Sequence, residues 1–90
     1  MKKHLNIRIT GRVQGVFFRS YLRENARKLG ISGFAENMPD GSVYAEAEGE
    51  EADLAEFLGL SRSGPYHARV GKIEHDFGPI KNFKEFDVGW

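Results

Sequence analysis

The spacing of apolar residues changes several times along this 90-residue chain, and the order of these changes constrains the fold more than any other feature. Apolar and polar residues alternate over residues 5–10, which is typical of a half-buried strand. The spacing then widens, and an apolar stripe predicts a helix over residues 20–29. Gly30 is well placed to end that helix in a left-handed conformation. The chain therefore begins with a strand followed by a helix.

The rest of the chain continues this pattern. We predict strands over residues 31–37 and 43–48, a helix from the acidic residues near 50 to about 61, a strand over 70–77 and a short terminal strand over 86–90. Pro39-Asp40-Gly41 supplies turn chemistry between the second and third strands. In the third strand Tyr44, Glu46 and Glu48 are expected to face solvent, and in the strand over 70–77 Ile73 and Phe77 are expected to point inward.

This order predicts an α+β fold of the ferredoxin-like, split βαβ type (βαββαβ). Its antiparallel sheet would carry two helices on one face, with the short C-terminal strand on a sheet edge. The length suits one domain over residues 1–90. A fold of this kind hosts many functions, so it does not identify the chemistry.

Composition removes several classes of function. The chain has no cysteine, which excludes disulfides, thiolate metal sites and cysteine nucleophiles and favours a reducing compartment. No apolar run resembles a signal peptide or a membrane span. We therefore expect a cytoplasmic protein with no membrane partner.

Charge is balanced overall, with 13 basic and 13 acidic side chains, but it is unevenly distributed. Residues 1–30 carry most of the basic side chains, and the acidic ones follow. This asymmetry could present positive potential to an anionic ligand. The alternative, which we favour for the total charge, is that the two halves interleave on folding and their fields largely cancel.

The loop over residues 11–19 (Gly-Arg-Val-Gln-Gly-Val-Phe-Phe-Arg) lies where a phosphate would bind. Backbone N–H groups at the start of a helix have no intrahelical partner, and the helix dipole favours an anion there. Gly15 lets successive N–H groups point inward, and Arg19 can add a bidentate contact. No Walker-type Lys-Ser/Thr follows the glycines. A plain connecting loop remains an equal alternative on spacing alone.

Asn37 closes the second strand, just before the turn. Its amide offers donors and an acceptor without charge, so it could orient a water molecule beside an anionic phosphate. The alternative, which is favoured for Asn37 considered alone, is that it merely starts the turn by bonding local backbone.

Together these segments resemble the acylphosphatase family. Residues 11–19 are similar to its first signature, and residues 33–43 (Gly-Phe-Ala-Glu-Asn-Met-Pro-Asp-Gly-Ser-Val), with Gly49 following, are similar to its second. The resemblance covers essentially the whole chain. Phe17 stands where many relatives carry Gly, and Met38 where Thr or Leu is common, so the shape of the pocket and the substrate preference are open.

The resemblance implies hydrolysis of the carboxyl–phosphate bond of small acyl phosphates, without a metal, a cofactor or a covalent intermediate. It implies that Arg19 and Asn37 are catalytic, with Asn37 positioning the water. The phosphoryl group would be held by Arg19 and by the loop backbone, over the residues Gln14, Gly15, Val16, Phe17 and Phe18. The implied partner is a small-molecule acyl phosphate, and we expect a monomer.

Other polar residues are given structural roles. His4, His67 and His75 show no metal-ligand spacing, and Glu46 and Glu48 show no sign of converging on a cleft. Ser42 could touch the rim of the site. An RNA-binding domain has a related element order, but residues 43–48 are acidic where such a domain needs interleaved basic and aromatic residues. The other alternative is an acylphosphatase-like module of a carbamoyl-transfer protein.

Overall fold

The computed structural model describes residues 1–89 and shows seven regular elements among them. In chain order they are β1 (Lys2–Arg12), α1 (Phe18–Lys28), β2 (Ser32–Asn37), β3 (Val43–Glu50), α2 (Glu51–Ser63), β4 (Arg69–Gly78) and β5 (Phe86–Val88). The order matches the prediction, although β1 is longer at both ends and α1 begins two residues earlier. The alternation of the terminal strand was also expected to include Trp90, which lies outside the described residues.

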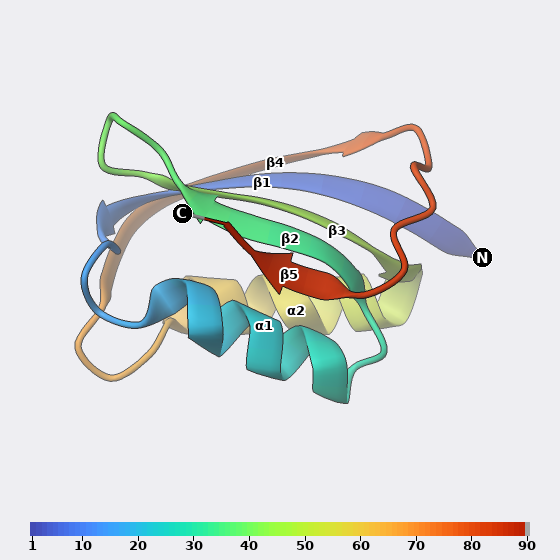
Figure 1. Ribbon diagram of the computed structural model, residues 1–90, viewed down its shortest axis with the longest axis horizontal. Coiled ribbons are helices and arrows are strands. Elements are labelled where there is room, and N and C mark those ends of the chain that lie inside the picture. Colours follow the sequence, from blue (N-terminus) through green and yellow to red (C-terminus); the bar gives the residue numbers. More distant parts are fainter. Residues whose placement is uncertain (90) are drawn as a thin grey trace.

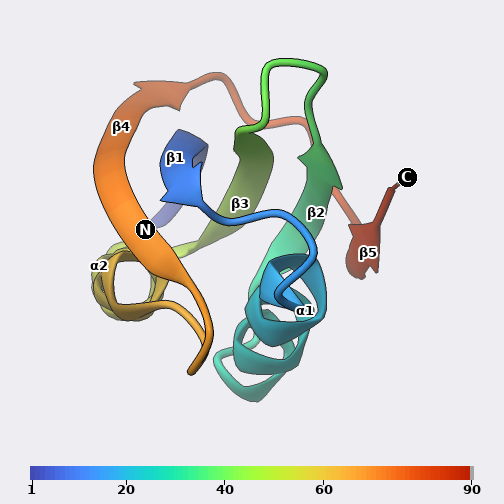
Figure 2. The ribbon, with the colours of Figure 1, turned by 90° about the vertical axis from the view of Figure 1, so that its left-hand side faces the viewer.

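The strands form one sheet with the order β4-β1-β3-β2-β5. The pairs β4–β1, β1–β3 and β3–β2 are antiparallel. The fourth pair, β2–β5, is parallel, and β5 lies at the sheet edge. Both helices cover the same face of the sheet (Figures 1 and 2). This is the predicted ferredoxin-like α+β fold.

The core lies between the sheet and the helices. Its sheet side is formed by the alternating residues of β1 and β3, and its helix side by Phe18, Leu22 and Ala26 of α1 with Leu54 and Phe57 of α2. α1 ends as predicted: Gly30 has a φ of 70°, and the N–H of Ile31 donates to the Ala26 carbonyl. The buried stripe fixes the rotation of α1 and therefore decides which of its residues face the loop before it.

The prediction that Glu46 and Glu48 face solvent was wrong. They do lie on the face of β3 away from the helices, but they are only 6% and 1% exposed. Residues 79–85, which we call the covering segment, contact this second face: the N–H groups of Lys81 and Phe83 donate to the Glu48 carboxylate at 2.5 and 3.1 Å. A strand pattern predicts two faces, but it does not predict that a loop 33 to 35 residues further along the chain covers one of them.

Phe77 also departs from its prediction. It pairs with the buried Leu5 on the helix side of the sheet, yet it is 59% exposed, whereas Ile73 packs against the core as expected. The reason is that β4 is an edge strand, and the helices do not cover Phe77. Within residues 1–89, no helix is both long and apolar enough to cross a membrane.

Candidate active site

The loop between β1 and α1 and the turn between β2 and β3 meet at one end of the sheet, the end that faces the viewer in Figure 2. A cavity of about 490 Å³ opens there. Its lining comes from the loop, from α1 and from two strand ends, namely Val13, Gly15, Phe17, Phe18, Arg19, Ser20, Arg23, Asn37 and Val88. The two residues to which the sequence assigned chemistry, Arg19 and Asn37, line the same cavity.

The loop backbone has the conformation that an anion site needs. Gly15 and Phe17 have positive φ angles of 73° and 64°. Left-handed residues among right-handed ones turn successive N–H groups to the same side. The backbone N–H groups of Gln14 through Phe17 donate to no acceptor within residues 1–89. These donors are therefore available to a ligand oxygen at the start of α1.

The Gln14 side chain holds this loop against the β2–β3 turn. Its Nε2 donates to the carbonyl of Met38 at 2.8 Å and to that of Ser42 at 3.0 Å. The N–H of Met38 in turn donates to the Ser42 carbonyl. One amide thus fixes the loop relative to the residue that follows Asn37. The sequence assigned Gln14 only a backbone contact, and its bridging role was missed.

The turn itself is held by Asp40 and Ser42. Asp40 accepts hydrogen bonds from the Ser42 hydroxyl at 2.6 Å and from its N–H at 2.9 Å, and Arg8 donates to the same hydroxyl. These bonds, with the charge of Arg8, lower the pKa of Asp40. Ser42 is buried and is absent from the cavity lining, so its contacts support the turn and not the rim.

Arg19 lies in the first turn of α1, half-buried, and its guanidinium donates to the carbonyl of Gly89. Gly89 is fixed in turn because its N–H donates to the Ala35 carbonyl of β2 at 2.8 Å. Gly89, the residue that follows β5, therefore helps to orient Arg19, and the last residue of β5, Val88, forms part of the cavity wall. Sequence reasoning missed this contribution because nothing local links residue 19 to residues 88–89.

Asn37 is the last residue of β2 and pairs with Val43 across the strand. Its side-chain amide makes no hydrogen bond to any part of the chain that the structure describes. The alternative, in which the Asn37 side chain bonds the local backbone to start the turn, is therefore not what the structure shows. The amide borders the cavity with its donors and acceptor unused by the described residues.

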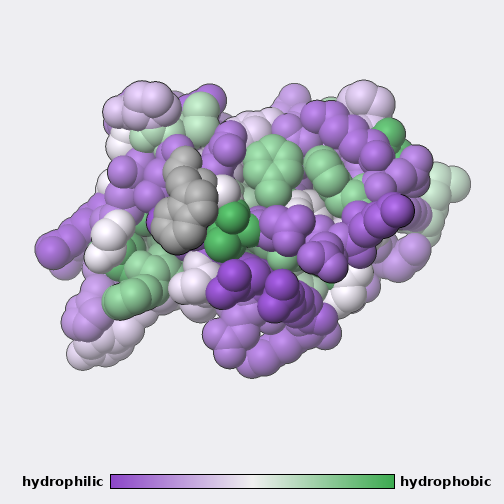
Figure 3. All heavy atoms as spheres, in the orientation of Figure 1, coloured by the Kyte–Doolittle hydropathy of each residue, from purple (hydrophilic) through white to green (hydrophobic). Residues whose placement is uncertain are grey.

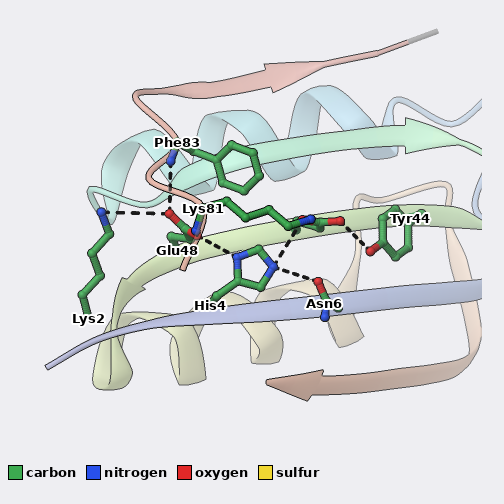
Figure 4. A network of polar contacts seen from close by, with 8 residues as sticks. Lys2, His4, Asn6, Tyr44, Glu48, Lys81 and Phe83 are labelled. Atoms are coloured by element: carbon green, nitrogen blue, oxygen red, sulfur yellow. Dashed lines mark hydrogen bonds and ion pairs between the residues drawn. The ribbon is translucent and has the colours of Figure 1, made fainter. Parts of the chain in front are cut away.

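Among the described residues, 1–89, none that lines the cavity carries a carboxylate or an imidazole. The buried acidic residues lie elsewhere, in the polar network on the second face of the sheet (Figure 4). There His4 Nδ1 lies 2.7 Å from Glu48, and its Nε2 lies 2.8 Å from Asn6. His4 therefore has the structural place expected for it, and His67 and His75 are exposed and do not line the cavity.

Comparison with known proteins identifies the family to which this sequence is similar. A family model described as Acylphosphatase matches residues 5–88. A protein named acylphosphatase from Archaeoglobus fulgidus is 45% identical over 86 residues, which are 96% of this chain and 97% of that protein.

Solved structures agree with this comparison. The crystal structure of an acylphosphatase from Bacillus subtilis superposes with a TM-score of 0.95 at 30% identity and covers all of both chains. Full-length HypF is similar with a TM-score of 0.89 at 27% identity, but this chain matches only 12% of that much longer protein.

Proposed function

The chain belongs to the acylphosphatase family of hydrolases, and from this premise we propose that the cavity lined by Arg19 and Asn37 is its catalytic site. The reaction is hydrolysis of the carboxyl–phosphate bond of a small acyl phosphate to a carboxylate and inorganic phosphate. The observation that supports this location is the shared cavity, which is lined by Arg19 and four other residues of the first signature and by Asn37 of the second.

The phosphoryl group binds in the curled loop. The N–H groups of residues 14–18 surround its oxygens, and the Arg19 guanidinium adds charge from the helix start. Phosphoryl transfer requires chiefly positioning and charge stabilisation. Gln14 supports this by holding the loop to the turn, so that the donors are arranged before the substrate binds.

Asn37 orients the attacking water from the other side of the cavity. An amide can accept one hydrogen bond from water and donate others without placing a negative charge beside the phosphate. The acyl carboxylate is a good leaving group, so no protein acid is required at that oxygen, and the substrate itself accepts the proton of the water. That the described part of the lining contains no carboxylate agrees with this division of roles.

The proposed reaction uses no metal and no cofactor. Within residues 1–89, the polar side chains that line the cavity are Arg19, Ser20, Arg23 and Asn37. The charge of the two arginines favours an anion over a metal cation. Turnover of acetyl phosphate is therefore expected to be unchanged after dialysis against a chelator. Loss of turnover that added Mg²⁺ restores would contradict this part of the proposal.

Two substitutions test the assigned roles. Arg19→Ala removes charge that is needed both for binding and for the transition state, so kcat/KM for acetyl phosphate should fall at least about a thousandfold. Inorganic phosphate should also become a weaker competitive inhibitor.

Asn37→Ala should lower kcat by about a hundredfold or more, while the inhibition constant of phosphate changes little, because a positioned water matters chiefly in the transition state.

The matched control is Arg62→Ala, which removes an exposed arginine from the last turn of α2. It should keep wild-type kinetics, because Arg62 does not line the cavity. If Asn37→Ala kept full turnover, the assignment of the water to Asn37 would be wrong.

The alternative is an acylphosphatase-like module of a carbamoyl-transfer protein, and the likeness to part of HypF shows that this fold also occurs within a longer chain. The higher identity to the Archaeoglobus fulgidus acylphosphatase, 45% against 27% for HypF, favours the acylphosphatase. We further propose one acylphosphatase domain over residues 1–90, monomeric and cytoplasmic, without nucleic-acid or membrane partners. The lack of cysteine supports a reducing compartment, and sedimentation analysis tests the monomer.

A further inference from the structure

Arg23 is a charged residue of the cavity lining to which the proposed reaction gives no role. It lies one turn beyond Arg19 on α1 and lines the same cavity. It also lines a second hollow of about 430 Å³ on the outward side of α1, together with Ser20, Glu24, Arg27 and Lys28. Ser20 and Arg23 thus belong to both hollows, which join the proposed catalytic site to the surface of the helix.

The second hollow is cationic. Three of its five lining side chains are basic and one is acidic. Within residues 1–89 neither Arg23 nor Arg27 nor Lys28 forms an ion pair within 4 Å. The part of the molecule where Figure 1 places α1 is strongly hydrophilic in Figure 3. Arg23 is half-buried, whereas Arg27 and Lys28 are exposed.

The spacing of the two arginines along α1 sets the size of the ligand. Residues four apart on a helix lie on one face, with Cβ atoms about 6 Å apart. A phosphoryl group at Arg19 therefore places Arg23 within reach of the far end of an acyl group of about four carbons. The same cavity is also lined by apolar residues, among them Val13, Phe17 and Val88, which suits the methylene stem of such a group.

We propose that Arg23 is a specificity residue that binds a second anionic group, a carboxylate or a phosphate, at the far end of the acyl chain. The enzyme then prefers acyl phosphates with an anionic end to neutral ones of equal length. The inference rests on the proposed function, because it assumes that the phosphoryl group binds at Arg19. A guanidinium suits this role because it offers a planar pair of donors to either anion.

The test compares two substrates of equal chain length. Succinyl phosphate ends in a carboxylate where butyryl phosphate ends in a methyl group. The measured quantity is the ratio of their kcat/KM values, succinyl over butyryl, for each variant. Because both substrates are assayed on one preparation, the ratio is independent of how much of a variant is folded.

Wild-type enzyme should give a ratio above one, and Arg23→Gln should lower it about tenfold, as the loss of a charge-assisted hydrogen bond predicts. Arg23→Lys should restore part of the ratio. Added salt should lower the ratio of the wild type and leave that of Arg23→Gln nearly constant. A substrate with a terminal phosphate in place of the carboxylate distinguishes which anion is preferred.

Arg27→Gln is the matched control, since it removes the same charge one turn further along α1 from a residue that lines only the second hollow. It should keep the wild-type ratio within about twofold. A ratio that is equal in the wild type and in Arg23→Gln would overturn the inference while turnover of both substrates left the proposed function intact. Failure of the wild type to hydrolyse either substrate would overturn the proposed function itself.

Discussion

Phe17 has a backbone conformation that a side chain rarely adopts. Its φ is 64° and its ψ is 28°, in the left-handed region, and its side chain is 80% exposed at the cavity rim. A left-handed residue other than Gly costs about 1 kcal/mol or more, and here little burial offsets that cost. The loop needs this angle to turn its N–H groups inward. The site therefore requires a backbone angle that suits Gly, whereas residue 17 is Phe.

Replacing Phe17 by Gly should therefore not destabilise the protein. We expect the free energy of unfolding to stay equal or to rise by up to about 1 kcal/mol, measured by urea denaturation. Phe77→Gly is the control, because Phe77 is also exposed but lies in the extended strand β4. There Gly should cost about 1 kcal/mol. Equal losses in the two variants would show that the angle at residue 17 carries no strain.

At the scale of elements, Glu48 makes two hydrogen bonds that attach the covering segment to the sheet. The carboxylate accepts bonds from the N–H groups of Lys81 and Phe83 and contacts His4 Nδ1. The Phe83 ring also stacks on His4 at 5.9 Å between centroids. The covering segment connects β4 to β5. β5 contributes Val88 to the cavity wall, and Gly89, the residue after β5, supplies the carbonyl that Arg19 contacts.

The attachment should make the protein sensitive to acid. Burial by itself raises the pKa of Glu48, but the hydrogen bonds from Lys81, His4 and Phe83, with the charge of His4, outweigh it and lower the pKa. A lowered pKa stabilises the fold above the pKa of the unfolded state, about 4.3. That contribution is lost as the pH falls through the lower folded value.

We therefore expect Glu48→Gln to lower the free energy of unfolding at neutral pH by about 1–3 kcal/mol and to flatten its decline below about pH 4.3. Thermal unfolding followed by circular dichroism at several pH values measures both effects. Glu74→Gln, an exposed carboxylate on β4, is the control and should change neither. An unchanged acid slope in Glu48→Gln would mean that Glu48 is not the group whose protonation weakens the fold.

For the whole molecule, the anion site should couple ligand binding to stability. A ligand that binds only the folded state stabilises it by about 2.7 kcal/mol at a hundred times its Kd. For a domain of this size each kcal/mol corresponds to about 4–8 °C in Tm. Inorganic phosphate should therefore raise the Tm by about 10 °C or more near saturation.

The control for this prediction is chloride at matched ionic strength, which should raise the Tm little. Arg19→Ala should lose most of the phosphate effect, whereas Asn37→Ala should keep it. A phosphate effect that persisted in full in Arg19→Ala would place the anion site elsewhere.

The sequence by itself determined the order of the helices and strands and pointed to the site residues, because both depend on local patterns of residues. Apolar spacing predicts β1 through β5 and both helices, since periods of two and of three to four reflect the geometry of a single element. The two signatures predict Arg19 and Asn37 as the residues of the site. The left-handed angle at Phe17 corresponds to the position where the resemblance expects Gly.

Only the tertiary structure decided what depends on distant segments. The burial of Glu46 and Glu48 requires residues 79–85 to lie over the sheet, and the bridging role of Gln14 requires the β2–β3 turn beside it. The contact of Arg19 with Gly89 depends on β5 returning to the edge of β2. Each of these contacts joins residues that lie more than twenty positions apart in the sequence. The spacing of apolar residues carries no information about such pairs, because packing and not local conformation brings them together.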